Sequence, residues 1–174
     1  MKLAFVVVTY QAERFLDGLF STLQQHTDLA DTEVVVVDNA STDGTLAELA
    51  RIGQGWPNLH VLPQTKNTGF AEGNNIGLRW ARERGAEFAL LLNQDLEVTP
   101  GWLPPLLAVM ASRPDVAAAQ PLVVLFSEPT LVNTAGNQLH FCGFGYCGGY
   151  RQTVESVRIE EGIRSVAFAS GAAL

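Results

Sequence analysis

The chain has 174 residues, of which 47% are hydrophobic and 17% are charged, so it can bury a globular core and does not have the composition of a disordered segment. Its net charge of −7, with 11 Lys and Arg residues scattered along it, argues against nucleic acid as the main partner. No apolar run approaches the roughly 18 residues that a membrane-spanning helix needs.

The first strand is predicted at Leu3 to Val8, although the N-terminus superficially resembles a secretory signal. Its apolar run is short and β-branched, and no small-residue cleavage site follows, which favours a strand of the core. Cys142 and Cys147 are too few to define a disulfide framework and lack Cys-x-x-Cys spacing. We therefore expect two free thiols in a cytoplasmic protein.

Strand-like and helix-like segments then alternate through the first 120 residues. Phe15, Leu19 and Leu23 recur every four residues and predict the first helix. The later segments that we predict are a strand at 33–37, a short helix around 46–52, a strand at 59–62, a helix at 70–84, a strand at 88–92, a helix from about 99 to 110 and a strand at 116–124. This rhythm predicts an α/β fold with a mostly parallel, doubly wound sheet and helices on both faces.

From about Ser127 the alternation stops, and glycines among aromatic residues predict irregular hairpin or loop structure. A last strand-like piece is expected at Ser165–Ala169. The sequence ends soon after that piece, and we expect the chain to be part of a longer protein.

Two of the predicted strands end in an acid. The run Phe88–Leu92 is followed by Asn93-Gln94-Asp95, and a run of four valines is followed by Asp38. In open α/β sheets ligands bind outside the carboxyl ends of the strands. Two acids at that edge predict a polar, metal-bearing ligand site.

Several familiar nucleotide sites are excluded by the sequence. A dinucleotide fold needs Gly-x-Gly-x-x-Gly after the first strand, where this chain has Thr9-Tyr10-Gln11-Ala12-Glu13. No Gly-x-x-x-x-Gly-Lys-Ser/Thr phosphate loop and no Gly-x-Ser-x-Gly elbow is present.

What remains resembles the donor-binding part of a family-2-like, inverting glycosyltransferase with the GT-A fold, close to the rhamnosyltransferase-like members. The blocks that carry the resemblance, in order, are Val7-Val8-Thr9-Tyr10-Gln11, Val35 to Thr45, Asn67 to Gly77, and Leu91-Leu92-Asn93-Gln94-Asp95. The last block occupies the place of the family's Asp-x-Asp motif. Gln11 stands where the family usually has Asn, and Gln94 where this subgroup often has Pro.

The resemblance implies one GT-A-like domain over 1–174, with 1–125 as the nucleotide-sugar-binding half and 126–174 as the start of the acceptor-side half. The activity it implies is transfer, with inversion, from a UDP- or dTDP-sugar, with dTDP-rhamnose as the leading donor. The acceptor would be a glycan or lipid-linked molecule in cell-surface polysaccharide biosynthesis, in the cytoplasm or at the cytoplasmic face of the inner membrane. The general base is expected beyond Leu174, so this chain alone is expected to be inactive.

The resemblance also implies a set of nucleotide-sugar-binding residues, namely Thr9, Tyr10, Asp38, Asn67, Gly69, Asn74, Asn93 and Asp95. Among them, Asp95 is the expected ligand of a divalent metal, Mg²⁺ or Mn²⁺, because these ions prefer carboxylate oxygen and share their shell with phosphates and water. Asp38 is expected to accept the imide N–H of uracil or thymine, with Thr9 and Tyr10 lining the base pocket.

Each of these roles has a structural alternative. Asp38 and Asp95 can be acids that cap or solvate a strand end, and Asn93 can be a local turn residue. Asn67 and Asn74 can hold their loop instead of touching the donor, which we favour slightly. Asp43, outside the set, is expected to organise its loop.

Other functions were weighed against this one. A non-catalytic sugar-nucleotide-binding module would keep Asp38 and Asp95 but lack a base. A phosphoacceptor signalling domain needs an acidic pair after the first strand, which Thr9-Tyr10-Gln11 does not supply. A nucleotidyltransferase needs a Gly-rich, Arg-bearing loop at the same place, and none is present.

Overall fold

The computed structural model describes residues 2–29, 31–157 and 163–174, and the chain divides into two compact units. The first unit ends at Leu103 and the second begins at Pro104, so the boundary lies at the start of helix α4 (Leu103–Ser112). The expected boundary at residue 125 falls inside the second unit, and that division stays a prediction. Within the described residues, no helix is long and apolar enough to cross a membrane.

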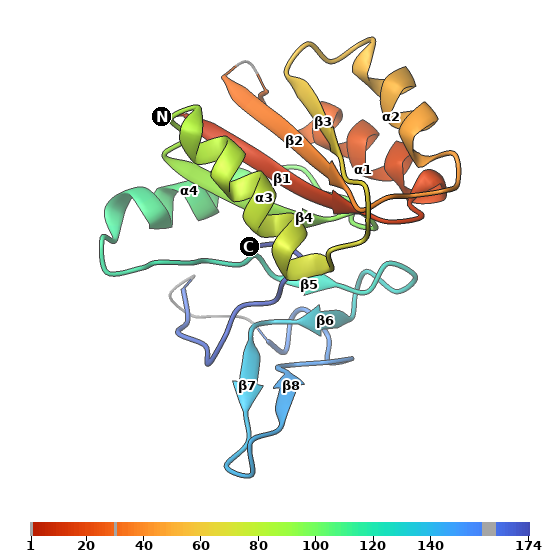
Figure 1. Cartoon of the computed structure of the whole chain (residues 1–174). Coiled ribbons are helices and arrows are strands. Elements are labelled where there is room, and N and C mark those ends of the chain that lie inside the picture. The colour runs from red at the N-terminus through yellow and green to blue at the C-terminus, as the bar shows by residue number, and fades with distance from the viewer. Residues whose placement is uncertain (1, 30, 158–162) are drawn as a thin grey trace. The chain divides into compact units, whose positions relative to one another are not determined.

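A four-stranded parallel sheet forms the centre of the first unit (Figure 1). Its strands are β1 (Leu3–Thr9), β2 (Thr32–Asp38), β3 (Leu59–Pro63) and β4 (Phe88–Asn93). Their spatial order is β3-β2-β1-β4. The chain therefore moves outward from β1 to β3 and then returns to place β4 on the other side of β1. This is the doubly wound arrangement that the sequence predicts.

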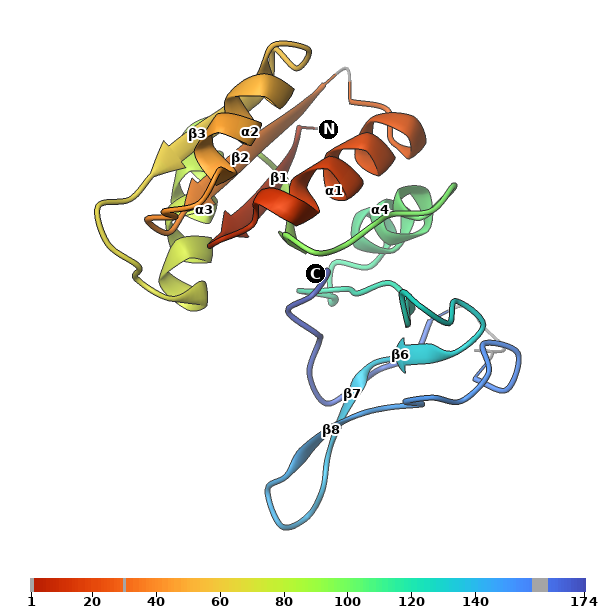
Figure 2. The same ribbon diagram turned by 90° about the vertical axis from the view of Figure 1, so that its right-hand side faces the viewer.

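Helices cover both faces of this sheet, as predicted. Helices α1 (Glu13–His26) and α2 (Thr45–Gly53) lie on one face, and α3 (Phe70–Glu83) lies on the other (Figures 1 and 2). Because both faces are covered, β1 and β2 read as nearly continuous apolar runs and are buried along almost their whole length. The predicted apolar stripe of α1 is confirmed by the buried residues Leu16, Leu19, Phe20 and Leu23.

Helix α3 approaches β1 closely because two of its glycines face the strand. A Cβ atom added to Gly77 would lie 2.3 Å from Val6 Cγ1, and one added to Gly73 would lie 2.8 Å from Val8 Cγ1. Both distances are far below ordinary carbon contact. Close packing of the helix is therefore the role that the structure gives to these glycines.

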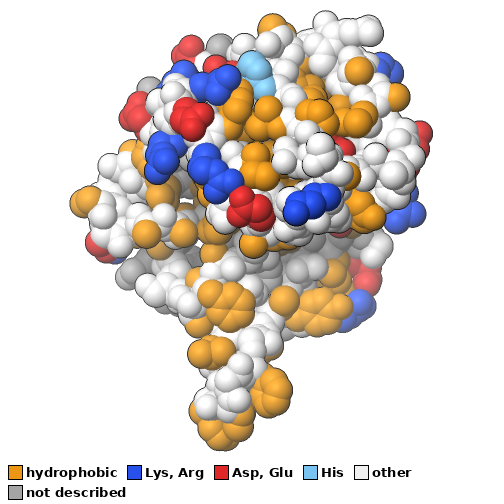
Figure 3. All heavy atoms as spheres, viewed as in Figure 1, with side chains coloured by type: hydrophobic (Ala, Val, Ile, Leu, Met, Phe, Trp, Pro, Cys, Tyr) orange, Lys and Arg blue, Asp and Glu red, His pale blue; other side chains and the backbone are white. Residues whose placement is uncertain are grey.

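The second unit has little regular structure, as the loss of alternation after Ser127 predicts. Strands β5 (Val123–Val124) and β6 (Val132–Thr134) form one antiparallel pair, and β7 (Asn137–Leu139) and β8 (Gly145–Cys147) form another. The β7–β8 hairpin exposes Phe141 and Phe144 at its turn, where hydrophobic side chains gather on the surface (Figure 3).

Two strand predictions in this unit are wrong. Of the segment 116–124, only Val123–Val124 is strand, because Pro121 lacks the backbone donor that a ladder needs and the alanines before it bury little surface. Ser165–Ala169 forms no strand and contributes a single bridge between Phe168 and Asn137. Its side chains at Ser165, Val166 and Ala167 are exposed, so no sheet covers them.

Candidate functional site

The carboxyl ends of β1, β2 and β4 bring the predicted site residues to one edge of the sheet. Thr9 ends β1, Asp38 ends β2 and Asn93 ends β4. The winding direction reverses between β1 and β4, and such a switch point is where open α/β sheets bind their ligands. The site is therefore centred on the segments that follow these three strands.

Asp38 is completely buried and lies within a hydrogen-bond network. Its Oδ1 accepts hydrogen bonds from Thr9 Oγ1 at 3.0 Å and from Ser41 Oγ at 2.5 Å, and its Oδ2 accepts one from the Ser41 backbone N–H at 3.0 Å. The carboxylate thus holds the end of β1 to the loop after β2. Contact with a nucleotide base stays a prediction, and this arrangement supports the alternative in which Asp38 organises the strand ends.

Gln11 joins the loop after β1 to the loop after β2. Its Oε1 accepts from the backbone N–H groups of Thr42 and Asp43 at 2.8 and 3.2 Å, and its Nε2 donates to Thr42 Oγ1 at 3.1 Å. Gln11 itself has a φ of 51°, an unusual value for a residue with a Cβ. The sequence pattern showed Gln11 only as a departure from the family's Asn, and this bridging role was missed.

Asp43 organises the same loop, as predicted. Its Oδ1 accepts from the Thr45 hydroxyl at 2.5 Å and from the Thr45 N–H at 3.1 Å, and its Oδ2 accepts from the Glu13 N–H at 3.2 Å. The hydrogen bond from the Thr45 hydroxyl is the main cause that lowers the pKa of the Asp43 carboxyl below its usual 3.8. The Thr45 hydroxyl also accepts from the Ala12 N–H at 2.8 Å, so both loops share one network.

Asn39 connects the end of β2 to the segment that begins α3. Its Oδ1 accepts from the N–H and the hydroxyl of Thr68 at 3.2 and 3.1 Å, and its Nδ2 donates to Gly69 O at 3.2 Å. Asn39 is 2% exposed, which leaves it little access to a ligand. The sequence places Asn39 in a block that resembles the family but indicates no role for it.

Asn67, Gly69 and Asn74 all stabilise the start of α3. Asn67 Oδ1 accepts from the Gly69 N–H at 2.8 Å, and Gly69 has a φ of 84° that favours glycine. Asn74 is buried and donates to Phe70 O at 3.0 Å. These contacts match the loop-holding alternative for the two asparagines, whereas their contact with a donor stays a prediction.

Tyr10 follows the end of β1 and is exposed, with 48% of its surface accessible. Its backbone is held by the side chain of Gln94, whose Oε1 accepts from Tyr10 N at 2.8 Å and whose Nε2 donates to Tyr10 O at 3.2 Å. Gln94 lies between Asn93 and Asp95, so this pairing ties the loop after β1 to the turn after β4. It was not foreseen from the sequence, where Gln94 stands only as a departure from Pro.

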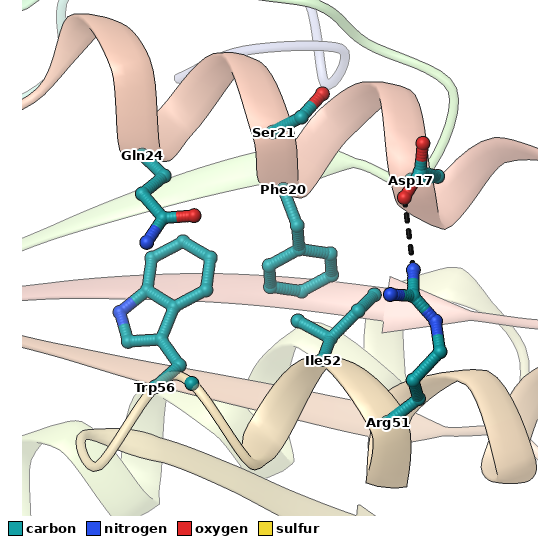
Figure 4. Close-up of a pocket in the computed structure, with 8 residues that line it drawn as sticks. Asp17, Phe20, Ser21, Gln24, Arg51, Ile52 and Trp56 are labelled. Carbon is teal, nitrogen blue, oxygen red and sulfur yellow. Dashed lines mark hydrogen bonds and ion pairs between the residues drawn. The ribbon is translucent and has the colours of Figure 1, made fainter.

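A pocket elsewhere in the first unit contains none of the predicted residues. It lies between α1 and α2, with an ion pair of 2.9 Å between Arg51 and Asp17 at its edge (Figure 4). The residues that line it are Asp17, Phe20, Ser21, Gln24, Arg51, Ile52, Gly55 and Trp56. Its walls come from helices and the turn after α2, so it is separate from the strand ends.

The sequence profile described as "Glycosyl transferase family 2" matches residues 4–156, which is most of the chain. The chain belongs to glycosyl transferase family 2. The family's profile covers all four strands of the parallel sheet and the three segments that follow β1, β2 and β4.

Three similar proteins illustrate the glycosyltransferase family 2 assignment. The dTDP-rhamnosyl transferase RfbF of Shigella flexneri is 33% identical over 94 residues, which is 53% of this chain and 29% of RfbF. The structure of S. aureus TarS in complex with UDP-GlcNAc is 29% identical, with a TM-score of 0.56, over 64% of this chain and 32% of that one. The mannosyltransferase PcManGT of Pyrobaculum calidifontis, in complex with GDP-Man and Mn²⁺, is 23% identical, with a TM-score of 0.55, over 71% and 35%.

These likenesses show the GT-A fold of the chain, and at 23% identity the likeness to PcManGT shows the fold alone. The chain spans about a third of the length of RfbF, of TarS 1–349 and of PcManGT. It therefore corresponds to one part of the family's longer members.

The turn after β4 has the oxygen chemistry that the family's metal would need. Asp95 is exposed and, among the described residues, forms no hydrogen bond or ion pair. Asn93 Oδ1 is buried without a hydrogen-bond partner. The described part of the chain holds no group of three or more His, Cys, Asp or Glu side chains that could bind a metal by itself. A cation at Asp95 would thus draw its other ligands from a diphosphate and water, which Mg²⁺ and Mn²⁺ accept.

Proposed function

We propose that this chain carries the donor site of a glycosyltransferase that moves a sugar from a UDP- or dTDP-sugar to a glycan or lipid-linked acceptor, with inversion. The observation that carries the proposal is the pairing of two exposed groups at the switch point. The Gln94 side chain bonds the backbone of Tyr10, whose side chain is exposed, and the next residue is Asp95, whose exposed carboxylate has no partner among the described residues. A nucleoside diphosphate would use both, since its base stacks on an aromatic ring and a carboxylate can hold the divalent cation that neutralises its phosphates.

Asp95 is the residue that would hold a divalent cation, and a bound cation would neutralise the charge that develops on the departing diphosphate. Asn93, which ends β4 beside Asp95, would use its side-chain amide to bond the donor's ribose or a phosphate. Thr9 and Asp38 would support the base pocket from the interior of the protein, because both are buried and hydrogen-bonded to each other.

Inversion requires the acceptor hydroxyl to attack the anomeric carbon from the face opposite the diphosphate. The new bond joins the acceptor oxygen to that carbon, the bond from the carbon to the diphosphate oxygen breaks, and the hydroxyl proton passes to a general base. We assign that base to no residue of this chain. The part of the reaction that we place here is the binding and orientation of the donor.

The name of one relative supports dTDP-rhamnose as the leading donor, since the RfbF protein is a dTDP-rhamnosyl transferase. The TarS complex with UDP-GlcNAc supports the wider class of pyrimidine nucleotide sugars. A role in cell-surface polysaccharide biosynthesis, in the cytoplasm or at the cytoplasmic face of the inner membrane, follows as part of the same proposal.

Calorimetric titration of the chain with UDP and dTDP, each with and without Mn²⁺, tests the proposal. We expect binding that strengthens at least tenfold with Mn²⁺, because the cation bridges Asp95 and the diphosphate. The same titration with GDP tests the preference for a pyrimidine base. A stronger response to UDP or to dTDP would identify the donor's nucleotide.

The matched variants are Asp95→Ala and Asp31→Ala, which remove the same charge at opposite edges of the sheet. Asp31 directly precedes β2, whereas Asp95 follows the end of β4. Asp95→Ala should abolish the Mn²⁺ dependence, and Asp31→Ala should leave it intact. The proposal fails if the folded wild-type chain binds no nucleotide, or if both variants lose binding equally.

A further inference from the structure

Gln94 continues the pairing between β1 and β4 beyond the end of the sheet. The backbone ladder of these strands ends at the pair Val8 and Asn93. Past that point, the Gln94 side-chain amide takes the place of a backbone peptide group of the neighbouring strand. Its oxygen accepts from Tyr10 N at 2.8 Å and its nitrogen donates to Tyr10 O at 3.2 Å. A side-chain amide has the same donor and acceptor as a peptide group, so it can satisfy both.

This pairing matters because Tyr10 is otherwise at the start of a loop. The next residue, Gln11, has a φ of 51°, so the chain turns sharply away from β1. The Tyr10 side chain is about half exposed and, within the part of the chain that the structure describes, has no hydrogen bond of its own to direct it. A backbone held at both N–H and C=O fixes the direction in which the Cα–Cβ bond leaves the chain, and this limits the positions that the ring can reach by rotation about its side-chain bonds.

We propose that Gln94 is a positioning residue that orders Tyr10 for stacking on the base of a pyrimidine nucleotide. The inference rests on the proposed donor site and adds a residue to it. Gln94 does not touch the base, and it acts through the backbone of Tyr10. A ring that is ordered before the ligand arrives costs less conformational entropy on binding, so Gln94 should raise affinity for the nucleoside part of the ligand.

The variant Gln94→Met tests this inference, because methionine has similar length and no amide. Gln64→Met is the matched control, since the Gln64 amide also bonds a backbone carbonyl, that of Leu62 at 3.0 Å, but on β3. With Mn²⁺ present, we expect Gln94→Met to bind UDP or dTDP about tenfold more weakly, which is the scale of ordering one residue. We expect unchanged affinity for inorganic diphosphate, and unchanged affinity for both ligands in Gln64→Met.

A double-mutant cycle with Tyr10→Ala separates positioning from general damage. Alanine keeps the backbone N–H and C=O that Gln94 bonds but removes the ring. If Gln94 acts through that ring, Tyr10→Ala with Gln94→Met should bind UDP no more weakly than Tyr10→Ala alone. Losses that simply multiply would overturn the inference.

Amide hydrogen exchange gives a readout that does not depend on ligand. The Tyr10 N–H should exchange slowly in the wild-type chain and at least tenfold faster in Gln94→Met, while amides of β1 and β2 stay protected and show that the variant is folded. Unchanged exchange at Tyr10 would overturn the pairing itself.

The remaining outcomes distinguish this inference from the proposed function. A wild-type chain that binds nucleotide, with Gln94→Met binding it equally well, overturns the positioning role alone. Equal losses for nucleotide and inorganic diphosphate overturn it too, because Gln94 would then be ordering the Asp95 turn. A wild-type chain that binds neither nucleotide overturns the proposed function, and this inference with it.

Discussion

Asp38 and Asp95 follow buried strands of the same sheet, yet their surroundings are opposite. Asp38 is fully buried and accepts three hydrogen bonds, whereas Asp95 is exposed and has no partner among the described residues. A carboxylate whose oxygens are hydrogen-bonded within the protein helps to hold the shape of the site, whereas an exposed carboxylate without such bonds is available to a ligand. The two acids should therefore respond differently to substitution.

Asp38→Ala should lower the free energy of unfolding by about 3 kcal/mol, since it leaves the buried Thr9 hydroxyl and the part-buried Ser41 donors without their acceptor. Asp95→Ala should change it by less than about 0.5 kcal/mol, as is usual at exposed positions. Urea unfolding of both variants, followed by circular dichroism, provides the comparison. A small loss for Asp38→Ala would mean that the buried network contributes little to the fold.

At the scale of the element, the contact of α3 with β1 depends on glycine. Gly77 and Gly73 face Val6 and Val8, which are inside the core of the sheet. This contact sets how near α3, and the loop that precedes it, come to the carboxyl end of β1. The segment at Asn67 and Gly69 is therefore positioned by packing that occurs one and two turns further along the helix.

Gly77→Ala should destabilise the chain by about 1–3 kcal/mol despite alanine's better helix propensity, because its Cβ would lie 2.3 Å from Val6 Cγ1. The matched control is Gly53→Ala in α2, where the new Cβ would lie an ordinary 3.7 Å from Leu59 Cδ2. Thermal unfolding of both variants gives the measurement. A Gly77→Ala protein as stable as the control would show that α3 can move outward at little cost.

At the scale of the whole molecule, the parallel sheet and its three helices belong to the first of two units. All hydrogen-bonded pairs of that sheet lie between Leu3 and Asn93, and Trp102 is tied to the same unit by its Nε1 hydrogen bond to Thr27 at 3.0 Å. Apart from most of α4, the regular structure among the described residues of the second unit consists of short antiparallel pairs. The first unit is therefore built on a four-stranded parallel sheet, whereas the sheets described in the second unit have two short strands each.

A chain that ends at Ser112, where α4 ends, should keep the α/β fold of the first unit. We expect its far-ultraviolet circular dichroism to show helix and strand and its thermal unfolding to be a single cooperative transition, because the buried core of β1, β2 and α1 is intact. The full-length chain is the control. A truncated chain without a cooperative transition would mean that residues 113–174 are needed for folding.

The sequence by itself determined the elements of the first unit and their layering. Continuous apolar runs at β1 and β2 predicted buried parallel strands, and the four-residue spacing on α1 predicted its buried face, because burial of neighbouring residues leaves a periodic pattern in the chain. The acids at 38 and 95 were also found in this way. The strand predicted at 116–124 is present only at Val123–Val124. An apolar run does not reveal whether a partner strand pairs with it.

Only the tertiary structure decided which of the predicted site residues are bonded within the protein and which are exposed. Gln11 bonds to residues 31 and 32 positions away, and Gln94 bonds to Tyr10 across 84 positions. Such pairs form because strand order brings the ends of β1, β2 and β4 together, and strand order leaves no local periodicity in the sequence. For the same reason, the different environments of Asp38 and Asp95 became visible only once their neighbours in space were known.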